Sequence, residues 1–247
     1  MNIKSVERIA VFSDIHGNLQ SLETVADEIK REDVDGFFCC GDIVGYGGNP
    51  NECVEIIRDL GCPVVVGNHD YAALGLTSTD YFNDVARAAI MWTAKELTED
   101  NTAYLKSLPF AHCQNNFYFV HASPRCPEEW NYVITMGEAE LNFYYFDQKL
   151  CFIGHSHQPF IVENKEGSLH CPRTPSLSIN DSARYLVNVG SVGQPRDRDP
   201  RACYAICDLK KNLVEIKRLE YDIASAQKAI LDNNLPRELA ERLAYGW

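Results

Sequence analysis

The sequence predicts an α/β fold, because short apolar segments alternate with helical patterns through its first third. Residues 8–12, 37–40 and 63–66 have the length and composition of buried strands, and helical patterns cover 19–32 and 50–60 between them. A strand, helix, strand, helix, strand order predicts a parallel sheet whose crossovers are right-handed.

The helices of this region are defined by the types of residue that form and flank them. Apolar residues recur on one face of the helix expected over 19–32, and this face should pack against the sheet. The helix expected over 50–60 has Asn49 as a candidate N-cap, Pro50 in its first turn and Gly61 after its end.

The same patterns predict the rest of the chain. Helices are expected at 83–108, 138–146, 223–233 and 237–245. Strands are expected at 117–120, 150–153, 160–163, 185–189, 202–209 and 213–219. We expect the whole chain, 1–247, to form a single domain. Within it, the mainly helical segment 71–116 is either a cap that sets the size of a pocket or a crossover that packs on the sheet.

The composition limits the classes of partner. With a formal net charge of -12, the chain lacks the clustered Lys and Arg that bulk nucleic-acid binding needs. It has no apolar run of transmembrane length, and the apolar stretch 9–12 is too short for the core of a signal peptide. The ten cysteines include no C-x-x-C pair, which favours reduced and mostly buried thiols. We therefore expect a soluble cytoplasmic protein with no membrane partner, in an oligomeric state that is left open.

Residues able to bind a metal ion follow five of the predicted strands. They occur as Ser-Asp-Ile-His at 13–16, Gly-Asp at 41–42, Gly-Asn-His-Asp at 67–70, His121, and Gly-His-Ser-His at 154–157. In an open parallel sheet, ligands bind beyond the carboxyl ends of the strands. We therefore expect these five strand ends to meet at one edge of the sheet.

The residue types indicate which ions this edge would bind. The candidate ligands are Asp14, His16, Asp42, Asn68, His121, His155 and His157. Carboxylates, imidazoles and an amide oxygen without thiolate favour Mn, Fe, Co, Ni or Zn over a structural Cys-rich zinc site. Seven ligands are more than one ion needs, but they fit two divalent or trivalent transition-metal ions that share a carboxylate.

The motifs D-x-H, G-D, G-N-H-D, a single His and G-H-x-H, in this order, resemble the calcineurin-like metallophosphoesterase superfamily. The sequence Gly-Ser-Val-Gly-Gln-Pro-Arg at 190–196 is similar to its bacterial and archaeal phosphodiesterase branch, which is often described as related to diadenosine tetraphosphatases. The resemblance covers about residues 8–205, and five motifs in order are specific where any one alone would be weak. It implies a four-layer α-β-β-α sandwich of two mixed sheets flanked by helices.

The resemblance also implies two overlapping sets of metal ligands. They are Asp14, His16, Asp42 and His157 for one ion, and Asp42, Asn68, His121 and His155 for the other. Asp42 would bridge the ions together with a hydroxide, which attacks phosphorus in line with the leaving oxygen. Because Asp14 and His16 are two residues apart, both face the ions only if the chain turns there, and Gly17 makes such a turn easy.

Three further residues are candidates for catalysis. The resemblance makes His69 the acid that protonates the leaving oxygen, and Asp70 could raise the pKa of His69 by holding its imidazolium. Arg196 either binds the substrate phosphate with its planar fork or lies in a solvated loop that pairs with its own acidic residues. Trp130 and Tyr132 either stack on a planar group of the substrate or pack against the protein.

These residues favour metal-dependent hydrolysis of a small phosphoester, a diester or a monoester, with nucleotides as candidate substrates. A phosphoprotein phosphatase is an alternative, but the chain is short and offers no obvious peptide groove. A protein-binding scaffold without activity on the same fold is a second alternative. Scaffolds of this kind tend to lack acid or ligand residues, and this chain retains all of them.

Overall fold

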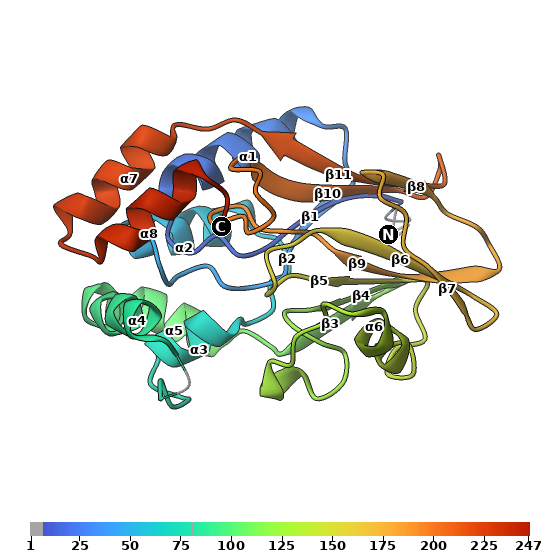
Figure 1. Cartoon of the computed structure of the whole chain (residues 1–247), viewed down its shortest axis with the longest axis horizontal. Coiled ribbons are helices and arrows are strands. Elements are labelled where there is room, and N and C mark those ends of the chain that lie inside the picture. The colour runs from blue at the N-terminus through green and yellow to red at the C-terminus, as the bar shows by residue number, and fades with distance from the viewer. Residues whose placement is uncertain (1–6, 81) are drawn as a thin grey trace.

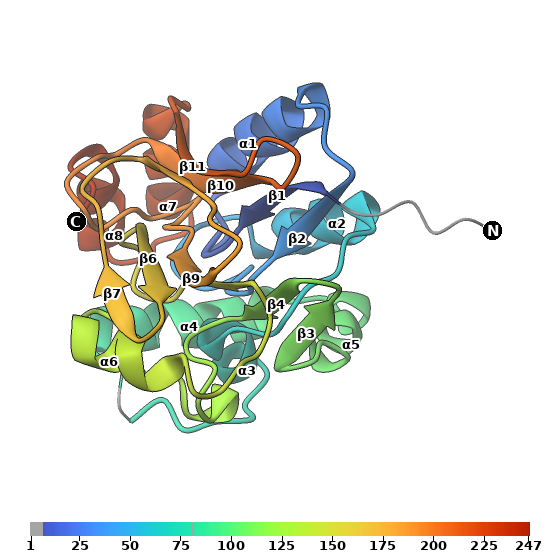
Figure 2. The same cartoon turned by 90° about the vertical axis from the view of Figure 1, so that its right-hand side faces the viewer.

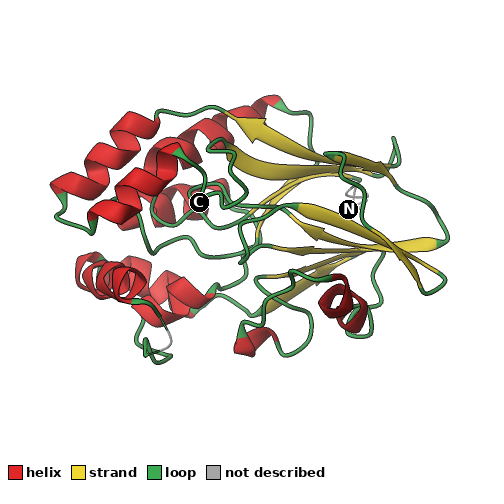
Figure 3. Ribbon diagram, viewed as in Figure 1, coloured by secondary structure: helices red, strands yellow, loops and turns green. Residues whose placement is uncertain are grey.

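The computed structural model describes residues 7–80 and 82–247, and two mixed β-sheets form its centre (Figures 1 and 3). The strands of the first sheet are β1 (Arg8–Phe12), β2 (Gly36–Cys39), β8 (Ser176–Ser178), β10 (Ala202–Asp208) and β11 (Leu213–Leu219). They are arranged in the order β2-β1-β10-β11-β8. β1 runs parallel to β2 and antiparallel to β10, and Phe12 pairs with Cys39. This register places the loops after β1 and β2 side by side.

The second sheet has six strands in the part of the chain that the structure describes. They are β3 (Ala111–Gln114), β4 (Phe117–Val120), β5 (Leu150–Ile153), β6 (Phe160–Lys165), β7 (Ser168–His170) and β9 (Ala183–Asn188). Their order is β3-β4-β5-β9-β6-β7, and β4, β5 and β9 are parallel. Phe119 pairs with Phe152, so β4 and β5 also end at the same height.

Alternating side chains in the strands divide the apolar core into layers. In β1, Ile9 and Val11 point into the core between the two sheets, where Phe152 of the second sheet also lies. Ala10 and Phe12 point to the opposite face of the same strand and pack against helices. Because both faces of β1 are buried from Ile9 onward, its sequence is apolar from Ile9 to Phe12 and does not alternate with polar residues.

Helices cover the outer faces of both sheets (Figure 2). Those with eight or more residues are α1 (Leu19–Arg31), α2 (Pro50–Leu60), α4 (Asp84–Glu96), α5 (Glu99–Lys106) and α7 (Ile223–Asp232). The shorter ones are α3 (Asn68–Ala73), α6 (Met136–Asn142), α8 (Arg237–Glu241), η1 (Pro127–Glu129) and η2 (Arg242–Ala244). α1 and α2 pack on the first sheet and α6 packs on the second, while α4, α7 and α8 share a separate apolar cluster at one end of the sandwich. No helix within the described ranges is long and apolar enough to cross a membrane.

The architecture confirms the predicted four-layer sandwich with two mixed sheets and corrects several of its elements. The predicted strand 63–66 is reduced to one parallel bridge between Val64 and Cys39, because the next N–H on the side of β2, that of Gly67, donates to the Asp70 carboxylate and not to β2. Three short strands, β3, β7 and β8, were not predicted, and the helix expected over 138–146 ends at Asn142.

The segment 71–116 is mainly helical in the structure, as the sequence predicts, although its last residues form β3. Residue 81 of this segment lies outside the described residues, as do residues 1–6 of the domain predicted over 1–247.

Candidate metal centre

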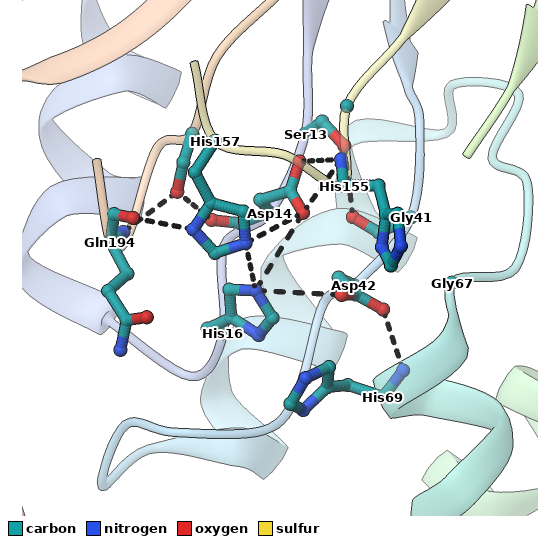
Figure 4. Close-up of polar contacts among 12 residues, drawn as sticks. Ser13, Asp14, His16, Gly41, Asp42, Gly67, His69, His155, His157 and Gln194 are labelled. Atoms are coloured by element: carbon teal, nitrogen blue, oxygen red, sulfur yellow. Dashed lines mark hydrogen bonds and ion pairs between the residues drawn. The ribbon is translucent and has the colours of Figure 1, made fainter. Parts of the chain in front are cut away.

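The structure brings all seven predicted metal ligands together at the carboxyl ends of β1, β2, β4 and β5 and at the start of α3, and all seven are buried. The edge differs from the predicted one, because it is formed by two sheets packed face to face and not by one parallel sheet. Hydrogen bonds join the sheets at this point (Figure 4). The N–H of His155 donates to the Asp14 carboxylate at 2.9 Å. Nδ1 of His121 contacts the carbonyl of Cys40 at 2.7 Å.

Five of the seven candidate ligands have a left-handed backbone conformation. They are Asp14 (φ 56°), His16 (φ 51°), Asp42 (φ 52°), His155 (φ 64°) and His157 (φ 59°). A side chain at such an angle costs on the order of 1–3 kcal/mol, so the surrounding structure must hold it in place. The N–H of Asp14 donates to the carbonyl of Gly41, and the carbonyl of Asp14 accepts from the N–H of Gly193. The turn that the sequence predicts at Gly17 therefore already begins at Asp14.

Two glycines bring the backbone into contact with the candidate carboxylate ligands. A Cβ on Gly67 would lie 2.0 Å from Oδ1 of Asp42, and a Cβ on Gly154 would lie 2.2 Å from Oδ2 of Asp14. Both distances are far below van der Waals contact, so only glycine leaves space for the carboxylates. The glycines of the G-N-H-D and G-H-x-H motifs are therefore part of the site, a role that the sequence analysis did not assign to them.

We expect Gly67→Ala to displace the Asp42 carboxylate, lower the free energy of unfolding by about 1–3 kcal/mol and weaken metal binding. Urea denaturation and metal analysis of the purified variant measure both effects. Gly137→Ala in α6 is the matched control, because a Cβ there meets open space and should be neutral or slightly stabilising. Unchanged stability and metal content in Gly67→Ala would contradict the steric role of Gly67.

Backbone carbonyls fix the orientation of three candidate imidazole ligands. Nδ1 of His16 lies 3.2 Å from the carbonyl of Val44, and Nδ1 of His157 lies 2.6 Å from the carbonyl of Gln194. His121 makes the same contact with Cys40. Because a carbonyl only accepts hydrogen bonds, Nδ1 carries the proton and Nε2 presents a lone pair to the centre of the site. Metal-binding histidines are usually oriented by hydrogen bonds of this kind.

The centre of the site gathers acceptor atoms. Nε2 of His16 and Nε2 of His157 are 3.0 Å apart, and Nε2 of His121 lies 3.0 Å from Oδ1 of Asn68. Nε2 of His155 is buried and has no hydrogen-bond partner. Lone pairs at such distances repel one another unless a cation lies between them. The donor set therefore fits bound metal ions, and its nitrogens and oxygens without sulfur suit transition metals.

The charges of these groups support the same conclusion. Burial lowers the pKa of His155 to about 3 and the pKa of His16 well below its ordinary value, so both imidazoles are neutral at pH 7. Burial alone would raise the pKa of Asp14 and of Asp42, but the neighbouring imidazoles hold both below the ordinary value. Neutral imidazole and ionised carboxylate are the forms that bind metals, and His121, whose pKa the Asp42 carboxylate raises to about 9 despite burial, would give up a proton on binding one.

The ligand atoms form overlapping groups, within each of which all atoms lie within 4.8 Å of one another. One group contains Asp14, His16 and His157, and another contains Asp42, His121 and His155. Asp42 also groups with His16, at 3.5 Å between Oδ2 and Nε2. This arrangement suits two ions with the Asp42 carboxylate between them.

His69 and Asp70 lie beside this centre, but the structure separates their roles. The His69 ring contacts Tyr46 and Phe82, and its Nδ1 is buried without a hydrogen-bond partner. The predicted contact of Asp70 with the His69 imidazole is wrong. The Asp70 carboxylate instead accepts from the backbone N–H groups of Val44 and Gly67, each at 3.0 Å. The Asp70 carboxylate thus joins two loops through these hydrogen bonds. Burial lowers the pKa of His69 to about 4.

A cavity of about 390 Å³ opens over Asn68, His69 and His155. Its walls include the rings of Tyr46, Phe82, Trp130 and Tyr132, and the Tyr132 ring stacks on His155 at 4.0 Å. Phe82 was not predicted as a site residue, because nothing in its local sequence distinguishes it from a packing residue.

Arg196 also lines this cavity. Its Nη2 donates to the Tyr46 hydroxyl at 3.2 Å and to Oε1 of Gln194 at 3.0 Å. The alternative of a self-paired loop applies to its neighbours and not to Arg196, since Asp199 pairs with Arg201.

An α-β-β-α sandwich that gathers Asp, His and Asn at the carboxyl ends of its central strands is the framework of a metal-dependent hydrolase. The chain belongs to the calcineurin-like phosphoesterase superfamily, whose domain model matches residues 8–212. It is 48% identical to an uncharacterized protein of Methanocaldococcus jannaschii over 96% of this chain and 98% of the relative.

Solved structures extend the comparison. The crystal structure of a metallophosphoesterase from Sphaerobacter thermophilus is similar with a TM-score of 0.86 and 42% identity, over 98% of this chain and 100% of that chain. A hypothetical protein of Pyrococcus horikoshii OT3 shares the fold with a TM-score of 0.79 at 20% identity, over 97% and 98% of the two chains. These similarities confirm the predicted family and fold.

Proposed function

We propose that this protein hydrolyses small phosphoesters with two transition-metal ions held by Asp14, His16, Asp42, Asn68, His121, His155 and His157. The cluster of buried ligand atoms is the observation that carries this proposal, because Nε2 of His16 and Nε2 of His157 are 3.0 Å apart and Nε2 of His155 has no hydrogen-bond partner. When bound, two such ions supply an activated water and positive charge against the phosphoryl oxygens.

The protein's own groups supply the remaining functions. Asp42 would be the carboxylate shared by the two ions, and His69, which lines the cavity, would give a proton to the leaving oxygen. Arg196 binds a non-bridging oxygen of the phosphate with the guanidinium that it directs into the cavity. Residues 71–116 act as the cap, since Phe82, Asn83 and Ala86 of this segment line the cavity.

The cavity favours a small substrate over a phosphoprotein. Its volume of about 390 Å³ is the size of a small-molecule site, and aromatic rings bound it on several sides. Both phosphodiesters and phosphomonoesters fit these observations, so substrate preference is an outcome of the test.

Removal of metal is expected to abolish hydrolysis, and adding back Mn²⁺ is expected to restore it. The assay compares bis-p-nitrophenyl phosphate, p-nitrophenyl phosphate, a dinucleoside polyphosphate and a phosphopeptide, with bound metal measured in parallel. Faster turnover of the phosphopeptide than of every small ester would favour the phosphoprotein phosphatase. Two bound ions with no turnover of any substrate would favour the protein-binding scaffold and contradict the proposed function.

A further inference from the structure

Two arginines from distant parts of the sequence line the same cavity. Arg196 follows the second sheet, whereas Arg242 begins η2 near the end of the chain, beyond the residues that the family model matches. Tyr46 lines the cavity with them, and Nη2 of Arg196 donates to its hydroxyl at 3.2 Å. The sequence analysis missed Arg242, because a lone arginine in a C-terminal helix is usually solvated.

Neither guanidinium is neutralised by an acidic side chain. Within the described residues, no side-chain carboxylate forms an ion pair with Arg196 or Arg242, although the chain carries 35 acidic residues. Arg242 donates through Nε to the main-chain oxygen of Trp247, and Nε of Arg196 is buried without a partner. Burial and the charge of Arg196 lower the pKa of Arg242 below its ordinary value. The cavity wall therefore carries two guanidinium groups whose charges no side-chain carboxylate of the described residues balances.

The position of Arg242 is fixed by packing on both sides. Leu239 and Leu243 are buried in the cluster that α8 and η2 share with α4. The C-terminal turn is also tied to the loop that follows Arg196, because the N–H of Arg198 donates to the carbonyl of Gly246 at 2.8 Å. The fold thus holds the two guanidinium groups at one wall of the cavity, although like charges favour separation.

We propose that Arg196 and Arg242 form an anion subsite beside the metal centre, which binds a second phosphate group carried by the substrate. The subsite rests on the proposed function for its place next to the reacting phosphate. It goes beyond that function, because it selects phosphoesters with two phosphate groups over those with one.

The chemistry of the two side chains explains this selection. The N–H of Arg196 donates to the carbonyl of the candidate ligand His157 at 3.2 Å, which places Arg196 beside the metal centre, whereas Arg242 reaches the cavity from η2. A phosphate between the two would accept charge-assisted hydrogen bonds and remove their mutual repulsion. A substrate with a single phosphate at the metals leaves Arg242 without this partner.

Two matched pairs of ligands test the subsite by calorimetric titration of the metal-loaded protein. The pairs are methylphosphonate with methylenediphosphonate, and thymidine 5′-phosphate with thymidine 3′,5′-bisphosphate. In each pair only the second phosphate group differs. We expect the wild-type protein to bind the doubly phosphorylated member roughly 10-fold more tightly or better in at least one pair.

Variants of Arg242 assign the preference to this residue. Arg242→Gln should reduce the preference to about twofold or less, and Arg242→Lys should retain part of it because the charge remains. Arg237→Gln is the matched control, since Arg237 lies on the exposed face of α8 and pairs with Glu241. Unfolding midpoints close to that of the wild type show that each variant is folded.

No preference in either pair, or a preference that Arg242→Gln leaves unchanged, would overturn the subsite. Competition of the same ligands with bis-p-nitrophenyl phosphate hydrolysis separates this result from a failure of the proposed function. Turnover without a preference means that only the subsite is wrong. Binding with the expected preference but without turnover means that the subsite exists and the hydrolytic function is wrong.

Discussion

Replacing Asp42 with asparagine is expected to abolish metal-dependent hydrolysis and to reduce the bound metal from two ions to one or none. The Asp42 carboxylate groups with His121 and His155 on one side and with His16 on the other. Removing a residue that only hydrogen-bonds to a metal ligand already lowers metal affinity or activity by about 10–100-fold. Loss of the carboxylate that both ions would share should therefore lower them more. Metal analysis and kcat/KM for bis-p-nitrophenyl phosphate measure the two effects.

The asparagine variant is a sharp test because it preserves the local structure. Oδ1 of Asp42 accepts from the N–H of His69 at 2.8 Å, and an asparagine oxygen can accept the same bond. The loop should therefore stay in place while the negative charge is lost. Asp147→Asn, on the exposed surface, is the control for the charge change. Normal activity with two ions bound in Asp42→Asn would rule out a bridging role for Asp42.

The sequence predicted that the candidate ligands lie at one edge of the sheets because most of them come just after a buried strand, although Asn68 begins α3 after a single bridge. Apolar strands of four or five residues give a clear pattern, and a polar residue just after such a strand must lie at the edge of a sheet. The pattern does not show how many sheets meet at that edge. His121 and His155 belong to the second sheet, and the four-layer arrangement that joins them to Asp14 followed from the family resemblance alone.

Other features of the site depend on contacts between distant segments, which local patterns do not reveal. Asp70 seemed a partner of His69 because the two are adjacent in sequence, but the first turn of α3 directs its carboxylate to the N–H groups of Val44 and Gly67. Arg242 reaches the cavity only because α8 and η2 pack against α4. Gly67 is close to Asp42 because two loops pack together. The only local indication of this role in the sequence is the position of Gly67 in the G-N-H-D motif.

The variant His69→Asn is expected to slow the hydrolysis of esters with poor leaving groups by about 10²–10⁴-fold, and to change p-nitrophenyl esters much less. A poor leaving oxygen must gain a proton as its bond to phosphorus breaks, whereas p-nitrophenolate leaves without one. His69 lines the cavity floor, and its Nδ1 has no partner in the protein that would compete for the proton. The series runs from p-nitrophenyl phosphate through phenyl phosphate to an alkyl phosphate, under saturating Mn²⁺.

The acid role requires a protonated imidazole, although burial lowers the pKa of His69 to about 4 in the protein without substrate. The negative charge of a bound phosphate opposes this shift, so the proton should be taken up together with the substrate. His69 also lies close enough to His16 and Asp42 to bind a metal ion with them. The metal content of the His69→Asn variant therefore distinguishes the acid role from a role as a metal ligand. An equal loss of rate for every leaving group, together with loss of metal, would make His69 a ligand and not the acid. Unchanged rates for all esters would remove it from the mechanism.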